Sequence, residues 1–284
     1  NQVYKNNFKN STYVGSVADV RGSDLPRINA ITFGSPCQDF SLAGKQKGMG
    51  GERSSLILEA IRLVKECRPD FFIWENVKGT FSSNSGEDFA AILQAFTNIG
   101  GYRLEWQLLN TKWFLPQNRE RVYLVGYTSN KSGGQIFPIT RESNGVIKNN
   151  KINIGSARTR KYMNQAQKLE IRNDNSTNTL TSVQKDNYVL GYSRDRKGKV
   201  MSRHKKKLAN TLHASSGSGN NTDQFINSIR KLTPLECERL QGFPDDWTKF
   251  GTEGLISNTQ RYKMCGNAVT VDVVEAVGKQ ILKL

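Results

Sequence analysis

Three places in this sequence carry reactive side chains next to short apolar runs. Cys37 and Glu75 each follow such a run, and Arg119 and Arg121 stand two residues apart beside a third. A thiol can act as a nucleophile, and a carboxyl group can act as an acid or a base. Taken singly these are weak signals, because such a cysteine is usually a small buried hydrophobe and such charged residues are usually solvated. Only their combination indicates a reaction site.

The use of cysteine and histidine narrows the chemistry. The cysteines form no CxxC pair, which argues against structural zinc and a disulfide scaffold and favours a reducing, cytoplasmic compartment. The two histidines, His204 and His213, lie in a polar, basic stretch, so we expect no hydrolytic triad and no metal centre. Any general acid or base in the first half of the chain is then a carboxyl, a lysine, a tyrosine or a thiol.

Alternating strands and helices are expected to position these groups. Strands are predicted at 28–33, 71–74, 102–109 and 122–125, and helices from Ser54 or Ser55 to Cys67 and around 89–96. This alternation predicts an α/β fold that is doubly wound around a mostly parallel sheet. Such sheets bind ligands at the carboxyl ends of their strands, where Pro36-Cys37-Gln38 and Glu75-Asn76-Val77 lie.

The C-terminal part has its own helix signals. Thr233-Pro234-Leu235-Glu236 predicts a capping box with proline at the first helical position, and this helix ends before Gly242-Phe243-Pro244. A last helix is predicted after Gly266-Asn267, with one apolar side made of Val269, Val273, Val277 and Ile281. No apolar run reaches the roughly 18 residues that a membrane span needs.

The net charge is high and unevenly distributed. The 284 residues carry 41 Lys and Arg against 25 Asp and Glu, a formal net charge of +16. Residues 141–230 hold 18 basic and 6 acidic side chains, a net charge of +12, and include the run Arg203-His204-Lys205-Lys206-Lys207. A lone basic run is usually a solvated surface, but a bias this wide favours a surface that neutralises phosphates. We therefore expect a polyanionic partner and a small, irregular, mostly β domain in this segment.

Five blocks of sequence, in order, resemble the motifs of the cytosine-C5 DNA methyltransferases of bacteria and phage. They are Gly34-Ser35-Pro36-Cys37-Gln38-Asp39-Phe40-Ser41, Glu75-Asn76-Val77-Lys78-Gly79, Gln117-Asn118-Arg119-Glu120-Arg121-Val122-Tyr123, residues 230–244, and Gly266-Asn267-Ala268-Val269. The resemblance spans nearly the whole chain apart from the basic middle. It implies a class I S-adenosylmethionine-dependent methyltransferase fold, which is Rossmann-like, and a DNA (cytosine-5-)-methyltransferase of the restriction-modification type.

The resemblance implies roles for the reactive residues. Cys37 is implied as the nucleophile that adds to C6 of cytosine and makes carbon 5 electron-rich. Glu75 is implied to hold N3 and the exocyclic amine, for which a raised carboxyl pKa is required. Arg119 is implied to contact O2 of the base, and Arg121 to support the loop and the DNA backbone. Because the C5–C6 bond is stacked in duplex DNA, the cytosine must be flipped out.

A second set of positions matches the family's contacts with S-adenosylmethionine. These positions are Ser16, Val17, Pro36, Leu56, Asn267 and Ala268. Ser16 departs from the pattern, because the family usually has an acidic residue there for the adenine amine. A hydroxyl accepts that hydrogen bond without charge assistance.

The start of the sequence departs from the family more strongly. The family opens with a Phe-x-Gly-x-Gly turn that cradles the cofactor, followed about twenty positions later by an acidic residue for the ribose. This chain begins at Asn1 without either, and Asn1-Gln2-Val3-Tyr4 is expected to belong to the helix that follows them. We expect a truncated product, or a split enzyme in which a second polypeptide supplies the Gly-rich segment, and poor methylation by this chain alone.

The basic segment matches the family's variable target-recognition region in place. We expect a catalytic domain at 1–140, a target-recognition domain at 141–265 and a C-terminal helix at 266–284 that returns to the catalytic domain. Double-stranded DNA is the expected partner, without a membrane or a metal, at the bacterial nucleoid. Candidate DNA contacts are Gln38, Ser41, Gln117, Arg203, Lys205, Lys206, Lys207, Thr211 and Leu212, with Thr179-Leu180 as a competing match for the last two.

Two other functions stay open at this point. One branch with the same motifs methylates a tRNA cytosine, although the long basic segment favours DNA. A DNA-binding fragment or subunit without activity of its own would keep the scaffold and lack the Gly-rich turn. The intact Cys37, Glu75 and Arg119 argue against that second alternative.

Overall fold

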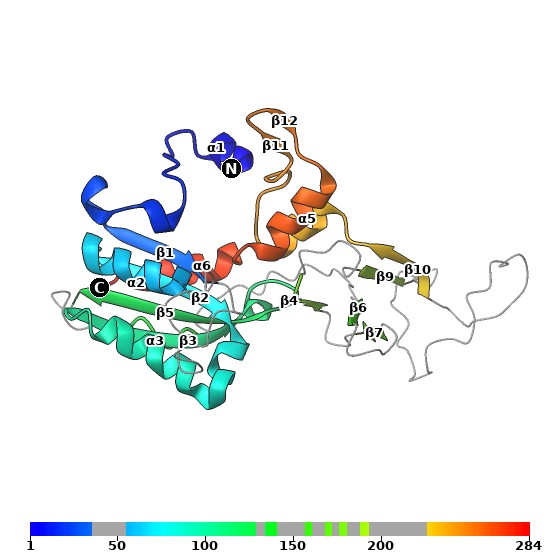
Figure 1. The fold of residues 1–284 in the computed structure, drawn as a ribbon. Helices are drawn as coiled ribbons and strands as arrows, with labels where there is room; N and C mark the ends of the chain where they lie inside the picture. The colour runs from blue at the N-terminus through cyan, green and yellow to red at the C-terminus, as the bar shows by residue number, and fades with distance from the viewer. Residues whose placement is uncertain are drawn as a thin grey trace, which may run out of the picture. The chain divides into compact units, whose positions relative to one another are not determined.

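The structure, a computed structural model, describes eight stretches of the chain (Figure 1). They are residues 1–35, 55–128, 134–140, 157–160, 168–171, 176–180, 188–192 and 226–284. The chain divides into two compact units. Unit 1 comprises 1–114, 119–147 and 269–284, and unit 2 comprises 115–118 and 148–268. Unit 2 therefore includes a short segment that lies, in sequence, just before Arg119.

A mixed four-stranded sheet forms the centre of unit 1, in the order β1-β2-β5-β3. β1 and β2 are parallel, and β5 runs antiparallel to both of its neighbours, β2 and β3. Three of the four strands in this described sheet thus share one direction, and the α/β prediction is confirmed. β5 is reversed because residues 111–119 are too short for the crossover that a parallel connection needs. The strands are β1 (Ala30–Gly34), β2 (Phe71–Val77), β3 (Tyr102–Asn110) and β5 (Glu120–Thr128).

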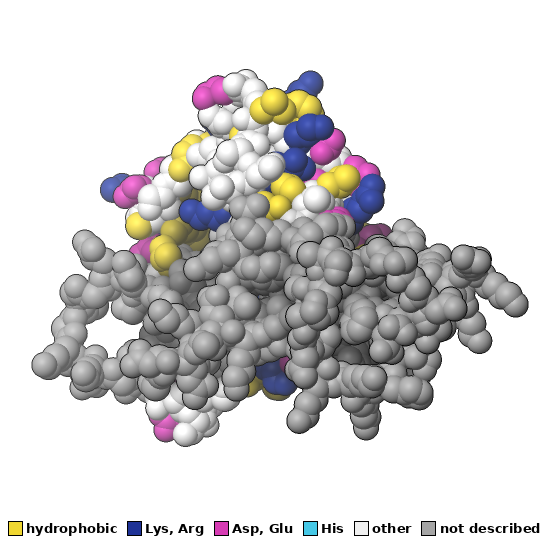
Figure 2. Space-filling view, turned by 90° about the vertical axis from the view of Figure 1, so that its right-hand side faces the viewer, with side chains coloured by type: hydrophobic (Ala, Val, Ile, Leu, Met, Phe, Trp, Pro, Cys, Tyr) yellow, Lys and Arg dark blue, Asp and Glu magenta, His cyan; other side chains and the backbone are white. Residues whose placement is uncertain are grey.

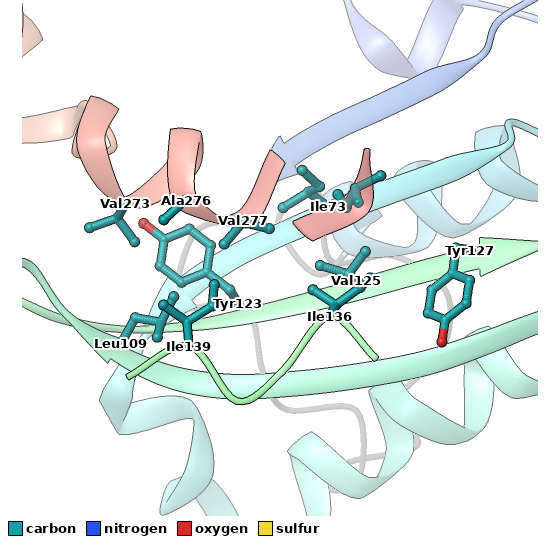
Figure 3. Close-up of a cluster of buried hydrophobic side chains, with 11 residues drawn as sticks. Ile73, Leu109, Tyr123, Val125, Tyr127, Ile136, Ile139, Val273, Ala276 and Val277 are labelled. Carbon is teal, nitrogen blue, oxygen red and sulfur yellow. The ribbon is translucent and has the colours of Figure 1, made fainter. Parts of the chain in front are cut away.

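Helices cover both faces of this sheet because side chains alternate along each strand. Phe72 and Trp74 of β2 pack with α2 (Ser55–Cys67) and α3 (Glu87–Thr97). Ile73, between them in sequence, points to the opposite face. There it packs with α6 (Val271–Ile281), as Figure 3 shows. The strand and helix predictions for this unit are therefore confirmed, except that Val269 lies before α6 and is exposed.

The first 35 residues add shorter elements to unit 1. They form α1 (Gln2–Asn7), as expected for a helix at the start, and two 3₁₀ turns, η1 (Val17–Asp19) and η2 (Gly22–Asp24). No residue from 1 to 35 is buried. Ile31 and Phe33 of β1 pack against the apolar core while partly buried, whereas residues 1–29 contribute no side chain to the described core clusters.

Unit 2 combines short strand pairs with two helices. The predicted capping box is present at Thr233, whose side chain accepts from Glu236 N while Glu236 accepts from Thr233 N. α5 was not predicted, because its polar sequence has no apolar stripe. The elements are β4 (Gln117–Asn118) with β8 (Thr177–Asn178), β6 (Ala157–Arg160) with β7 (Lys168–Ile171), β9 (Tyr188–Tyr192) with β10 (Ile226–Lys231), β11 (Phe250–Gly251) with β12 (Gly254–Leu255), α4 (Pro234–Leu240) and α5 (Asn258–Asn267). Nowhere in the described ranges is a helix long and apolar enough to cross a bilayer.

Candidate active site

Glu75 lies near the carboxyl end of β2, between β1 and β5. Its Cα partners are Gly34 on β1 and Tyr123 on β5. A Cβ atom at Gly34 would lie 3.5 Å from Glu75 Oε2 and 3.4 Å from the Glu75 carbonyl oxygen. The glycine therefore leaves open space beside the carboxyl group, on the side where the chain leaves β1.

The chain that follows β1 is tied to the residues on either side of Glu75. Asn76 Nδ2 donates to the carbonyl oxygen of Ser35 at 2.9 Å and to its Oγ at 3.1 Å. Trp74 Nε1 donates to the same Oγ at 3.1 Å. Ser35 is the last described residue before Pro36 and Cys37, which lie outside the described residues. The strand of Glu75 thus anchors the point from which the cysteine segment departs.

Two arginines face the Glu75 carboxylate. Arg121 Nε lies 3.1 Å from Glu75 Oε1, and Arg119 Nη2 lies 3.9 Å from the same atom. The side chain of Glu75 is 16% exposed and that of Arg119 only 4%. Despite the nearby Arg121, Oε1 accepts no well-directed hydrogen bond within the described residues. A buried carboxylate oxygen in that state is poised for a further partner.

Burial dominates the electrostatics of this cluster. It raises the pKa of Glu75, although the charges of Arg119 and then Arg121 oppose the shift. It lowers the pKa of Arg119 to about 10, with repulsion from Arg121 adding to the effect. Arg119 therefore stays positive at neutral pH. The raised pKa of Glu75 has the direction that the implied contact with N3 requires.

The backbone of Arg119 is held by the end of β3. Its N–H donates to Asn110 Oδ1 at 3.2 Å, and its carbonyl oxygen accepts from Thr111 N at 2.9 Å. Thr111 Oγ1 lies 2.8 Å from Thr270 Oγ1, which leads into α6. The guanidinium is thus carried on a short turn whose ends are both fixed within unit 1, which is the rigidity a positioned cation needs.

Tyr123 completes the buried surroundings of the carboxyl group and was given no role from the sequence. It is 2% exposed and packs among side chains of β5 and α6, as Figure 3 shows. Burial, followed by the charge of Glu75, raises the pKa of the phenol, so it stays neutral. Asn76 was also missed, although its place directly after Glu75 in the motif was a usable signal.

Three residues matched to cofactor contacts belong to neighbouring elements of unit 1. Ser16 caps η1, its Oγ accepting from Ala18 N at 3.3 Å, and Val17 is the first residue of that turn. η1 packs against α2, whose second residue, Leu56, is 38% exposed. Asn267 and Ala268 lie at the C-terminal end of α5, in unit 2. The contacts expected at these positions stay predictions.

Gln117, a candidate DNA contact, is held by partners within the protein, and its contact with DNA stays a prediction. The residue is fully buried in unit 2. Its Nε2 donates to the carbonyl oxygen of Leu240 at 2.7 Å, and its Oε1 accepts from Leu180 N at 3.1 Å. Both ends of the amide are therefore used within the protein. The remaining candidate DNA contacts lie outside the described residues: Gln38, Ser41, Arg203, Lys205, Lys206, Lys207, Thr211 and Leu212.

The described residues contain no cluster of three or more His, Cys, Asp or Glu side chains that could hold a metal ion. The site that they do contain is built from one carboxyl group, two guanidinium groups and a buried phenol. Such a set can bind a planar, polar heterocycle and stabilise negative charge that develops on it.

Comparison with known proteins identifies relatives over nearly the full chain. A family profile described as C-5 cytosine-specific DNA methylase matches residues 1–283. Type II methyltransferase M.Bsp6I from Bacillus sp. (strain RFL6) is 30% identical over 287 residues, which cover 99% of this chain and 87% of that protein. Type II methyltransferase M1.ScrFI from Lactococcus lactis subsp. cremoris is 31% identical over 291 residues, which cover 100% of this chain and 69% of that protein.

Solved structures agree with the fold. The S. pombe Dnmt2 methyltransferase has a TM-score of 0.61 at 20% identity and covers 100% of this chain and 87% of its own. The Entamoeba histolytica methyltransferase EhMeth has a TM-score of 0.61 at 17% identity and covers 100% of this chain and 86% of its own. The predicted methyltransferase fold is confirmed. A match from the first residue to the last but one, with relatives of this kind, shows that the chain belongs to the C-5 cytosine-specific DNA methylase family and is a DNA (cytosine-5-)-methyltransferase.

Proposed function

We propose that the chain transfers a methyl group from S-adenosylmethionine to carbon 5 of a flipped-out cytosine in a specific duplex DNA sequence, as the modification enzyme of a restriction-modification system. One observation carries this proposal. Glu75 is a largely buried carboxyl group with a raised pKa, and among the described residues its Oε1 accepts no well-directed hydrogen bond, although Arg121 Nε lies 3.1 Å away. Ring nitrogen N3 and the exocyclic amine of cytosine offer the acceptor and the donor that such a carboxyl group needs.

The proton on Glu75 is central to the mechanism. A protonated carboxyl donates to N3 with one oxygen and accepts from the amine with the other. Negative charge that develops on the ring is then met by a proton already in place. Burial favours the protonated form, because it raises the pKa of Glu75 against the pull of the two arginines.

Arg119 is proposed to hold the base through O2. Its side chain is nearly fully buried, and its backbone is fixed by Asn110 and Thr111. A guanidinium in such a site is a strong hydrogen-bond donor and stays charged. Arg121, 3.1 Å from Glu75 Oε1, holds the carboxyl group in place and supports the turn.

Cys37 is proposed as the nucleophile on the basis of its place in the chain, two residues after Ser35. Its thiolate adds to C6, and the displaced electron pair makes carbon 5 nucleophilic. Carbon 5 would then take the methyl group as the bond from that methyl to the donor sulfur breaks, and S-adenosylhomocysteine would leave. Loss of the C5 proton to a base returns an electron pair, the C6–S bond breaks, and the thiolate is restored. The anchoring of Ser35 by Asn76 and Trp74 would hold the start of this segment beside Glu75.

The residues described near η1 and α2 fit the adenine end of S-adenosylmethionine. Val17 and the exposed Leu56 provide apolar surface, and the exposed hydroxyl of Ser16 retains an acceptor site for an amine. Asn267 and Ala268 are proposed as further contacts. When bound, the cofactor supplies an electrophilic methyl group.

The duplex is proposed to contact the basic middle of the chain. The described side chains visible in Figure 2 mix Lys and Arg with Asp and Glu. In contrast, the sequence of 141–230 carries a net charge of +12, including Arg203, Lys205, Lys206 and Lys207. Binding through such a segment depends strongly on salt concentration.

The experiment that tests this function uses duplex DNA in which 5-fluorocytosine replaces cytosine. The fluorine cannot leave as a proton does, so an active enzyme stays attached to the DNA. We expect a covalent adduct in the presence of S-adenosylmethionine, and none with the Cys37→Ala variant. Tight DNA binding without an adduct would instead indicate a binding protein. Labelled methyl transfer to tRNA but not to duplex DNA would overturn the proposed substrate.

A further inference from the structure

A charged cluster on α2 holds the segment that carries the proposed adenine contacts. This α2 clamp consists of Glu59, Arg62 and Glu66. Arg62 Nη2 donates to the carbonyl oxygens of Val17 at 3.2 Å and Val20 at 2.8 Å. The guanidinium therefore binds the carbonyl of the first residue of η1 and that of the residue just after this turn.

The two glutamates keep the Arg62 guanidinium in place. Its Nε donates to Glu59 Oε2 at 2.7 Å, and its Nη1 donates to both carboxylate oxygens of Glu66 at 2.9 Å. All three nitrogens are thus engaged, which fixes the plane of the guanidinium. Side-chain hydrogen bonds with Glu66 and then Glu59 raise the pKa of Arg62, consistent with this arrangement.

The clamp continues to the second turn, η2. Glu66 Oε2 accepts from Gly22 N at 2.7 Å. A Cβ atom at Gly22 would lie only 2.6 Å from Glu66 Cβ. The backbone therefore approaches α2 more closely than a residue with a side chain would permit. Arg62 and Glu66 therefore hold residues 17–22 at three backbone atoms.

No buried apolar side chain could hold residues 17–22 on α2 if these hydrogen bonds were lost. None of residues 1–35 is buried, and Tyr13 and Val14, just before the segment, are 61% and 54% exposed. A loop without a buried side chain depends on hydrogen bonds for its order. Loss of the guanidinium would leave η1 free to move on α2.

We propose that Arg62 is a positioning residue for S-adenosylmethionine, which sets Ser16 and Val17 in the conformation that receives the adenine end. The inference rests on the proposed function, because it takes those two residues as cofactor contacts. A preorganised loop binds tightly because it is already ordered before the ligand arrives. The clamp would therefore act on cofactor affinity more than on the chemical step.

The test compares Arg62→Met with a matched control, Arg68→Met. Arg68, which directly follows α2, also donates to two carbonyl oxygens, those of Ile99 at 3.2 Å and Gly100 at 2.7 Å. Calorimetry with S-adenosylhomocysteine is expected to give a Kd raised about tenfold for Arg62→Met and unchanged for Arg68→Met. In methyl transfer, KM for S-adenosylmethionine should rise by a similar factor while kcat stays within about twofold.

Two further measurements separate positioning from a general loss of structure. Amide hydrogen exchange in the unliganded protein should become faster over residues 15–24 in Arg62→Met and not in Arg68→Met. Arg62→Lys keeps the charge but only one carbonyl bond, so its Kd should fall between those of the wild type and Arg62→Met. If Arg62→Met does not fold, Arg62→Lys carries the test alone.

Three outcomes would overturn the inference. Wild-type affinity and wild-type exchange over 15–24 in the folded Arg62 variant remove the positioning role. An equal loss of affinity in Arg68→Met shows that general destabilisation is the cause. Failure of the wild-type chain to bind S-adenosylhomocysteine overturns the proposed cofactor and this inference with it. This failure can be told apart from a failure of the inference alone, because it is seen in the wild type without any variant.

Discussion

Each unit of this molecule holds a buried glutamate next to an arginine, and the two glutamates are treated differently. Glu238 in unit 2 is fully buried and fully bonded. Its oxygens accept from Asp246 N at 2.9 Å, from Thr248 N at 2.8 Å, from the Thr248 hydroxyl, and from Arg261 Nη2 at 2.9 Å. This carboxylate joins α4, the turn after it and α5, and nothing is left for a ligand.

Glu75 in unit 1 has the opposite character. It faces Arg121 and Arg119, yet within the part of the chain that the structure describes Oε1 accepts no well-directed hydrogen bond, and burial raises the pKa of Glu75. A buried polar group that stays incompletely bonded reduces stability, so it persists where it has another use. The comparison teaches that burial and an arginine partner alone do not distinguish the proposed catalytic carboxyl group. Glu75 differs from Glu238 in the bonding of Oε1 among the described residues, a property that Asp88 Oδ1 shares, so it marks Glu75 only together with the two facing arginines.

The largest expected effect is on activity, in Glu75→Gln. An amide cannot pass a proton to N3, so kcat is expected to fall about a thousandfold, within the usual range for loss of a general acid. The melting temperature should change little, because no complete hydrogen-bond network is broken. Methyl-transfer rates and thermal unfolding measure both quantities. A variant with near-normal kcat would remove the assigned role of Glu75.

The matched change in unit 2, Glu238→Gln, should reverse this pattern. The amide NH₂ meets donors instead of acceptors, and Arg261 loses the nearer and more deeply buried of its two carboxylate partners, Asp246 remaining at 3.4 Å. We expect the free energy of unfolding to fall by about 3 kcal/mol, as for other broken buried ion pairs. Denaturant unfolding measures the loss. Activity per folded molecule should stay within about threefold of the wild type. A thousandfold loss of activity in Glu238→Gln would contradict the different roles assigned to the two glutamates.

Gln117 provides a third buried polar side chain and belongs with Glu238 by its bonding. Gln117→Ala leaves Leu240 O and Leu180 N without their partner, so we expect a loss of about 2 kcal/mol of stability. The slope of DNA affinity against salt concentration should not change, because no phosphate contact is removed. A smaller salt slope with unchanged stability would instead support a contact between Gln117 and DNA.

The smallest expected effect is a pH-dependent difference in stability between the wild type and the Glu75→Gln variant. A raised folded-state pKa means that the folded chain binds the proton more tightly than the unfolded chain. This contribution is present at low pH and is lost as pH rises from the unfolded value of 4.5 through the raised value. The melting temperature of the wild type minus that of Glu75→Gln should therefore decrease over this interval. An increase would mean that the arginines, and not burial, control Glu75.

Local patterns account for most of the elements that were predicted correctly. The apolar run Phe71–Trp74 and the helical spacing in Ser55–Cys67 are properties of neighbouring residues, so they can be read from the chain. The helix Asn258–Asn267 was missed because it is held by buried polar contacts of Arg261 and Tyr262 and not by an apolar stripe. Val269 was placed on the last helix because it continues the helical spacing of Val273 and Val277. The helix begins only at Val271, so this spacing does not correspond to helical structure at Val269.

The sequence by itself determined the class of fold, the order of the motif residues and the unequal distribution of charge, because these depend on side-chain type and short-range spacing. Only the tertiary structure decided which buried polar groups have all their hydrogen bonds. Gln117 finds its partners at Leu180 and Leu240, and Glu238 finds one at Arg261, all far away in the chain. Glu75 meets two arginines and still receives no well-directed hydrogen bond at Oε1 from any residue that the structure describes. Hydrogen bonding depends on distance and angle between folded segments, and no spacing along the chain contains that information.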